Sequence, residues 1–209
     1  YAATAFGPIV MLSISSAASG IAMTVLYASK SVRYITKYTK LSPFRFLAEN
    51  LLSSVLALLI LSGLMFLSVL GIFYSKFGVT PWPKDPIGLS LIVLLAALFE
   101  YSLSLFLSLL MVYLRAPRAA AFISFVPLIL GFLPFVGLGI SFESAIYLSP
   151  FNCISSLCYY HYSGDLPPTG GFFMPGPKTF VDVNLASISL VGWLFALILV
   201  DVYLLSKMR

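Results

Sequence analysis

The chain is a succession of long apolar stretches, separated by shorter segments that carry most of its charge. Five stretches reach the ~18 residues that a helix needs to cross the ~30 Å core of a bilayer. They cover about residues 2–27, 46–74, 88–114, 119–140 and 183–206. None of them alternates apolar and polar residues at every second position, as membrane β-strands do. The pattern therefore predicts an all-α, polytopic membrane helical bundle with five spans.

Two parts of the chain depart from a plain spanning helix. The fourth span contains Pro127 and Pro134 among several glycines, so we expect it to be kinked or interrupted. Residues 141–182 begin with the apolar, aromatic stretch SFESAIYLSPFNCISSLCYYHY, which should lie in the outer interface or dip into the bilayer as short re-entrant helices. The following stretch, SGDLPPTGGFFMPGPK, predicts an irregular exposed loop.

Composition agrees with a membrane protein, and charge adds an orientation. The chain is 60% hydrophobic and 9% charged, which excludes an ordinary soluble domain. Nine of its twelve Lys and Arg residues fall in three alternate segments: 30–45, the RAPR turn at 115–118, and the C-terminal end. Because basic residues are retained on the cytoplasmic side of a span, all three segments are predicted to be cytoplasmic. Topology thereby explains the net charge of +5, and nucleic-acid binding is not supported.

The same alternation places Tyr1 outside. The chain opens with Tyr1 instead of Met, within an apolar stretch that has neither a basic leader nor a cleavage site. We therefore expect one more span upstream, which would give six spans with both ends inside. Residues 1–209 would form a single transmembrane domain, since no segment is long enough to fold separately as a soluble domain.

Residues with the chemistry for catalysis or metal binding are scarce. The sequence has no HExxH motif for zinc and no Gly-rich ATP-binding loop, and its single histidine, His161, lies outside the spans. No catalytic residue and no metal site is predicted. Cys153 and Cys158 lie close together in the predicted outer segment. They either form a disulfide or remain two free thiols packed as small apolar groups.

One span carries a carboxylate near its midpoint. Ser104 and Ser108 follow Glu100 at i+4 and i+8, so the three share a helical face. This face either lines a translocation path or couples to protons, or else a protonated Glu100 bonds a Ser or Tyr of a neighbouring helix and fixes the packing. Glu49 and Asp201, near the inner ends of their spans, are expected to reach the interface.

The basic segment between the first two spans, KSVRYITKYTKLSPFR, predicts a short helix over about residues 31–40. A break before Pro43 should follow, because the residue ahead of a proline avoids the helical region. Arg33, Lys37 and Lys40 share one face of this helix. It would either lie on the inner membrane surface, held by anionic lipids, or dock a cytoplasmic partner.

The order of these features resembles the permease subunit of type 2 ATP-binding cassette exporters. The resemblance rests on a small-residue-rich span, a basic cytoplasmic helix, a Leu-Ser-Pro break and the stretch FRFLAENLLSSVLALLILSG. The later stretch YLSPFNCISSLCYYHY is similar to the family's outer re-entrant hairpin. The five spans would then match the family's second to sixth. The chain departs from the family in having only bases where an acidic residue and Gly-Thr often precede the Pro motif.

The resemblance implies a non-catalytic subunit, two copies of which pair in the cell membrane and form the translocation path. Its partners would be cytoplasmic ATPase subunits that hold ATP and Mg²⁺, a second permease copy and membrane lipids; the chain itself would need no cofactor. The residues expected to couple to the ATPase are Arg33, Tyr34, Lys37, Tyr38, Lys40, Ser42, Pro43 and Arg45. The cargo would be a lipid, lipid-linked glycan, peptide or drug. Two alternatives are a proton-coupled secondary transporter that uses Glu100 and an accessory scaffold without transport.

Overall fold

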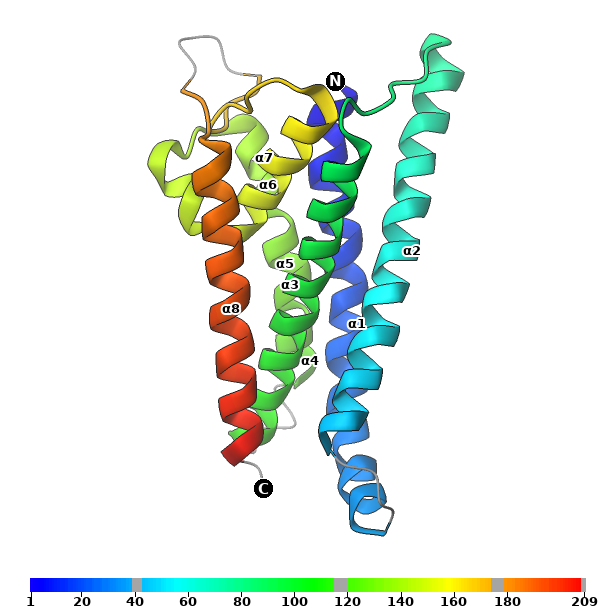
Figure 1. Cartoon of the computed structure of the whole chain (residues 1–209), viewed down its shortest axis with the longest axis vertical. Coiled ribbons are helices and arrows are strands. Elements are labelled where there is room, and N and C mark those ends of the chain that lie inside the picture. The colour runs from blue at the N-terminus through cyan, green and yellow to red at the C-terminus, as the bar shows by residue number, and fades with distance from the viewer. Residues whose placement is uncertain (39–42, 115–119, 174–178, 208–209) are drawn as a thin grey trace.

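The chain folds as an all-α membrane bundle. A computed structural model describes residues 1–38, 43–114, 120–173 and 179–207 (Figure 1). Four helices are long, and the remaining ones form a broken span and a short hairpin. In chain order the elements are α1 (Ala2–Tyr38), α2 (Pro43–Phe77), α3 (Pro86–Tyr113), α4 (Ala120–Ser124), α5 (Val126–Gly131), α6 (Leu133–Gly139), the 3₁₀ helix η2 (Glu143–Leu148), α7 (Pro150–Ser163) and α8 (Val183–Lys207). The described part of the chain contains no strand, only two isolated β-bridges.

Five helical segments are long and apolar enough to cross a membrane, which confirms the predicted number of spans. These segments are Ala2–Ile21, Glu49–Phe77, Pro86–Tyr113, Phe122–Gly139 and Val183–Leu204. Their outward surfaces are apolar, as the hydrocarbon of a bilayer requires. The helix α8 illustrates this, since Ile188, Phe195 and Val202 on it are all exposed.

The helix α1 is longer than predicted and has no break where a separate short helix was expected to begin. It continues to Tyr38 because residues 21–38 contain neither Gly nor Pro, so nothing in them interrupts the backbone hydrogen bonds. The helix α2 then begins at Pro43, ahead of the predicted start at Phe44 or Phe46. Proline suits the first position of a helix, where its missing N–H has no intrahelical role. Lys40 and Ser42 lie outside the described residues.

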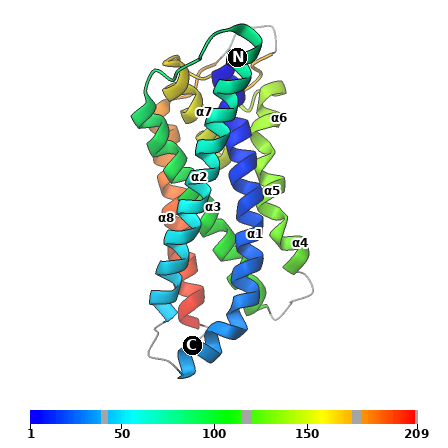
Figure 2. The ribbon, with the colours of Figure 1, turned by 90° about the vertical axis from the view of Figure 1, so that its right-hand side faces the viewer.

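The fourth span is interrupted, as its prolines predict. It consists of α4, α5 and α6, which run beside α1 (Figure 2) and are separated at Phe125 and Phe132. Pro127 and Pro134 each occupy the second position of a new helix. Neither proline can donate a backbone hydrogen bond. A new helix therefore begins just before each of them, because backbone N–H groups in the first turn of a helix have no intrahelical acceptor.

The spans alternate in direction, so the bundle has two chemically different ends. The helices α1 and α8 finish, and α2 begins, at one end, which we call the basic end (Figure 1). Residue 1 and the start of α3 lie at the opposite end. Lys84, Asp85 and Asp165 belong to the opposite end, close to the C-terminal end of α7. This arrangement agrees with the predicted sorting of charge between the two ends.

The helix α7 enters the bundle without crossing it. At its N-terminal end the ring of Phe151 contacts Phe99, halfway along α3, with ring centroids 5.4 Å apart. At its C-terminal end the carbonyl of His161 accepts a hydrogen bond from the backbone of Asp85, just before α3 begins (2.9 Å). Fourteen helical residues cover only about 21 Å. The segment η2–α7 is thus a re-entrant hairpin, as expected for this part of the chain.

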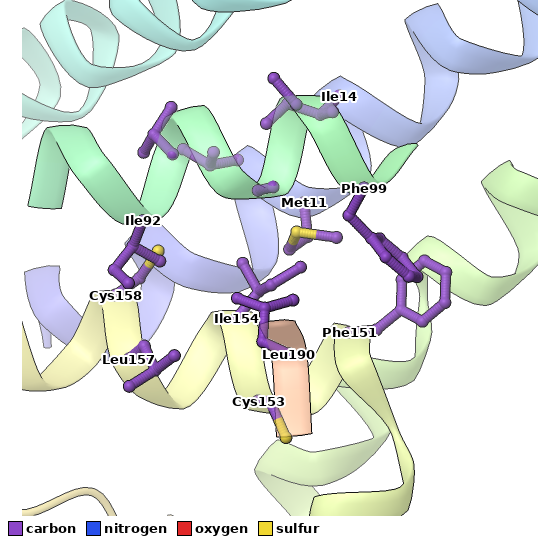
Figure 3. Packing of buried hydrophobic residues seen from close by; sticks show 14 of the residues in the cluster. Met11, Ile14, Ile92, Phe99, Phe151, Cys153, Ile154, Leu157, Cys158 and Leu190 are labelled. Carbon is purple, nitrogen blue, oxygen red and sulfur yellow. The ribbon is translucent and has the colours of Figure 1, made fainter. Parts of the chain in front are cut away.

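The hydrophobic core lies where α7 meets the long helices. Ile154 of α7 is fully buried among Met11 of α1, the α3 side chains and Leu190 of α8 (Figure 3). The approach of α1 to α7 requires a glycine. A Cβ added at Gly7 would lie 2.8 Å from the backbone oxygen of Ser155.

Candidate functional site

A groove separates α1 from α2 in the half of the bundle nearer the basic end. It encloses about 460 Å³. The groove exists because α1 presents Ala17 and Gly20 there, which leave space that larger side chains would fill. Its lining consists of Ala17, Gly20, Ile21 and Thr24 from α1 and Asn50, Ser53, Ser54, Ala57 and Leu58 from α2.

The polar side chains of the groove present hydrogen-bond acceptors. The hydroxyl of Thr24 donates to the carbonyl of Gly20 (3.0 Å), and that of Ser53 donates to the carbonyl of Asn50 (3.0 Å). Each hydroxyl donates its proton to a carbonyl of its own helix, so its oxygen lone pairs can still accept a hydrogen bond from another donor. The amide nitrogen of Asn50 donates to the hydroxyl of Tyr101 on α3 (3.2 Å).

The bundle also holds a buried carboxylate that sequence reasoning misplaced. Asp201 was expected to reach the membrane interface, but it is 4% exposed. The helix α8 continues past it to Lys207 and packs against α3, so Asp201 lies inside the bundle. Within the described part of the chain, its Oδ1 atom has no hydrogen-bond partner.

Glu100 lies deeper in the bundle and does not line the groove. It is completely buried and accepts a hydrogen bond from the hydroxyl of Ser15 on α1. Gly131 of α5 leaves room for Ser15, since a Cβ there would lie 2.5 Å from the Ser15 hydroxyl oxygen. The packing interpretation required such a bond to a neighbouring helix. The translocation-path interpretation stays a prediction.

The serines that follow Glu100 share its buried face, as the spacing predicts. Ser104 and Ser108 are both buried, and the hydroxyl of Ser108 donates to the carbonyl of Ser104 (2.8 Å). Among the described residues, the Oε2 atom of Glu100 and the hydroxyl of Ser104 have no hydrogen-bond partner. This face therefore holds polar atoms whose bonding capacity is not met by the described residues.

At the opposite end, Asp85 joins α3 to α7. Its Oδ1 atom accepts from the backbone N–H of Gly88 (2.9 Å) and caps α3, while its Oδ2 atom lies 2.8 Å from Nδ1 of His161. The Gly88 N–H, followed by the His161 hydrogen bond, lowers the pKa of the Asp85 carboxyl. Sequence reasoning treated both residues only as outer polar groups. The signal for the cap was present, because Asp followed by Pro86 before an apolar run is typical of a helix start.

Cys153 and Cys158 do not form the disulfide that was considered for them. Both are free thiols, buried on α7 (Figure 3). Five residues of helical spacing place them on different faces of α7, so their sulfurs point to different neighbours. Burial raises the pKa of both thiols. The alternative interpretation, two thiols packed as small apolar groups, describes the structure.

The residues expected to couple to an ATPase lie at the basic end. Arg33, Tyr34, Lys37 and Tyr38 belong to the last turns of α1, whose residues beyond the apolar stretch 2–27 extend it by about 16 Å. Pro43 and Arg45 belong to the first turn of α2. The structure therefore brings the two described parts of this set to the same end of the bundle (Figure 1).

Comparison with known proteins does not assign the chain to a family. No protein-family model, no curated protein and no solved structure matches the chain. Across the described ranges, no three His, Cys, Asp or Glu side chains gather into a group that could hold a metal ion.

Proposed function

We propose that this chain is the membrane-spanning permease subunit of an ATP-binding cassette exporter. Two copies pair and form the translocation path. Separate cytoplasmic subunits bind and hydrolyse ATP, and their motion reaches the permease through its basic end. The chain is a multi-pass protein of the cell membrane with its C-terminus in the cytoplasm.

The observation that carries this proposal is the extension of α1 beyond its spanning segment. A helix that continues for about 16 Å past its apolar stretch gives a soluble partner a rigid element to push against. It bears Arg33 and Lys37, and α2 returns from it at Pro43. A basic, protruding helix at the cytoplasmic end is the element that the resemblance assigns to ATPase coupling.

The re-entrant hairpin gives a second line of support. It lies between the broken span and the last span, and at the end of the bundle opposite the basic one. That is the place and the chain order in which the resemblance sets the outer hairpin of the exporters.

The decisive experiment combines copurification with export. We expect the chain, purified from its native membrane, to bring down a subunit whose sequence has a Gly-rich ATP-binding loop. Replacing Tyr34, Lys37 and Pro43 together by alanine should reduce both this association and ATP-dependent export. The control is Lys76→Ala, which removes an exposed basic residue near the opposite end. Unchanged association and export in the triple variant would refute the coupling role.

A second candidate is a proton-coupled secondary transporter. The observation that favours it is the buried Oε2 atom of Glu100, which lacks a partner in the described structure and could exchange a proton. Transport driven by a proton gradient without nucleotide, and abolished in Glu100→Gln, would support this candidate. The exporter proposal instead expects transport that requires ATP and tolerates Glu100→Gln, since glutamine can still accept the Ser15 hydrogen bond.

A further inference from the structure

We infer that the groove between α1 and α2 binds the headgroup of an amphiphile that donates hydrogen bonds, and that its preferred ligand bears a primary ammonium. The inference concerns binding alone and does not rest on the exporter proposal. It follows from the depth of the groove, the direction of the apolar surface beside it, and the chemistry of its walls.

The groove lies at the depth of lipid headgroups. The apolar stretch of α2 covers about residues 46–74, and Asn50 and Ser53 lie within its first three turns. On the other wall, Thr24 lies near the end of the apolar stretch of α1, which covers about residues 2–27. Polar side chains from both helices therefore meet at the boundary between the hydrocarbon core and the interface.

An apolar track continues from the groove toward the bilayer centre. Ile60 and Leu64 follow Ser53 at i+7 and i+11, so the three share one face of α2. Ile60 is 66% exposed and Leu64 is 56% exposed. A molecule whose head occupies the groove can lay its tail along this track. Its head would then point to the basic end and its tail to the bilayer centre, as in a lipid of the leaflet at the basic end.

The groove walls select for a donor. The Thr24 and Ser53 hydroxyls give their protons to backbone carbonyls and retain acceptor lone pairs, and Asn50 adds an amide oxygen. A primary ammonium carries three N–H donors and satisfies such acceptors. A quaternary ammonium has no N–H to donate and leaves them without a partner.

The test compares two photoactivatable lipids in nanodiscs, without nucleotide and without a partner subunit. They have identical acyl chains and differ only in their heads, phosphatidylethanolamine against phosphatidylcholine. We expect phosphatidylethanolamine to label peptides that contain residues 50–58 about tenfold more strongly, the factor for one hydrogen bond to a charged donor. Equal labelling by the two lipids would overturn the inference.

Variants assign the effect to the groove. Ser53→Ala combined with Thr24→Val should remove most of the preference for phosphatidylethanolamine, and Asn50→Leu should do so independently. The matched control is Ser68→Ala on the same helix, because the exposed Ser68 hydroxyl also donates to its own backbone, at Leu64 (2.8 Å). Ser68→Ala should leave labelling unchanged. A preference that survives in the Ser53/Thr24 variant would count against the site.

Competition separates two sources of the same head. Displacement of the lipid by free ethanolamine would identify the ammonium group alone as sufficient, so that soluble amines also bind. If ethanolamine does not displace phosphatidylethanolamine, and this lipid still labels more strongly than phosphatidylcholine, the ligand is a membrane lipid. Because the assay omits ATP, its failure leaves the exporter proposal untouched, and a failed ATPase copurification leaves the lipid site untouched.

Discussion

Among single residues, the carboxylates inside the bundle are the most consequential, because a bilayer offers them no water. Glu100 receives a hydrogen bond from Ser15, whereas the Oδ1 atom of Asp201 has no hydrogen-bond partner among the described residues. The two groups differ in depth and in their neighbours. Glu100 ties α3 to α1, and Asp201 is buried on α8.

Ser15→Ala should destabilise the bundle. It leaves a buried oxygen of Glu100 without its donor, which costs about 1–2 kcal/mol of the free energy of unfolding. Denaturation in detergent measures the change. The control is Ser13→Ala on the same helix, whose hydroxyl donates to the carbonyl of Ile9 in its own helix (2.9 Å). If both variants lose the same stability, the Ser15–Glu100 bond has no special role.

Asp85→Asn should change the dependence of stability on pH. Folding lowers the pKa of this carboxyl below its ordinary value of 3.8, chiefly through the Gly88 N–H and then through His161. The stabilisation is therefore fully present above pH 3.8 and is lost as pH falls through the lower, folded-state pKa. Asparagine still caps α3 but carries no charge.

Thermal unfolding of the two proteins over a pH series tests this expectation. The wild type should be the more stable protein at neutral pH, and its advantage over Asp85→Asn should shrink under acid conditions. An advantage that stays constant down to strongly acid pH would show that the charge of Asp85 contributes nothing.

At the scale of elements, the existence of helices was predictable, but their ends and their depth were not. Apolar length alone identifies the spans, and Pro127 and Pro134 identify the interruption in the fourth. The continuation of α1 to Tyr38 and the burial of Asp201 depend on neighbouring helices, about which a periodic pattern contains no information. The groove depends in the same way on how two helices meet.

The contact between α1 and α7 supplies a test at this scale. Gly7→Ala should destabilise the protein by about 1–3 kcal/mol, because the new methyl group would meet the backbone of Ser155, which cannot rotate away. Gly71→Ala on α2 is the control, since no atom lies within 4 Å of a Cβ there. Equal midpoints of thermal unfolding for the two variants would show that the re-entrant helix is not held at the depth described.

For the whole molecule, the orientation of the bundle decides whether its basic end can meet a cytoplasmic ATPase. The described thiols, Cys153 and Cys158, are buried and have raised pKa values, so they should react little with an aqueous maleimide. A cysteine introduced by substitution can then report its own side of the membrane. We expect Thr80→Cys, at an exposed position between α2 and α3, to be labelled by an impermeant maleimide in intact cells. Ser31→Cys, in the α1 extension, should be labelled only after permeabilisation. The reverse pattern would place the basic end outside, where no ATP-hydrolysing subunit could act on it, and would thereby exclude the proposed coupling.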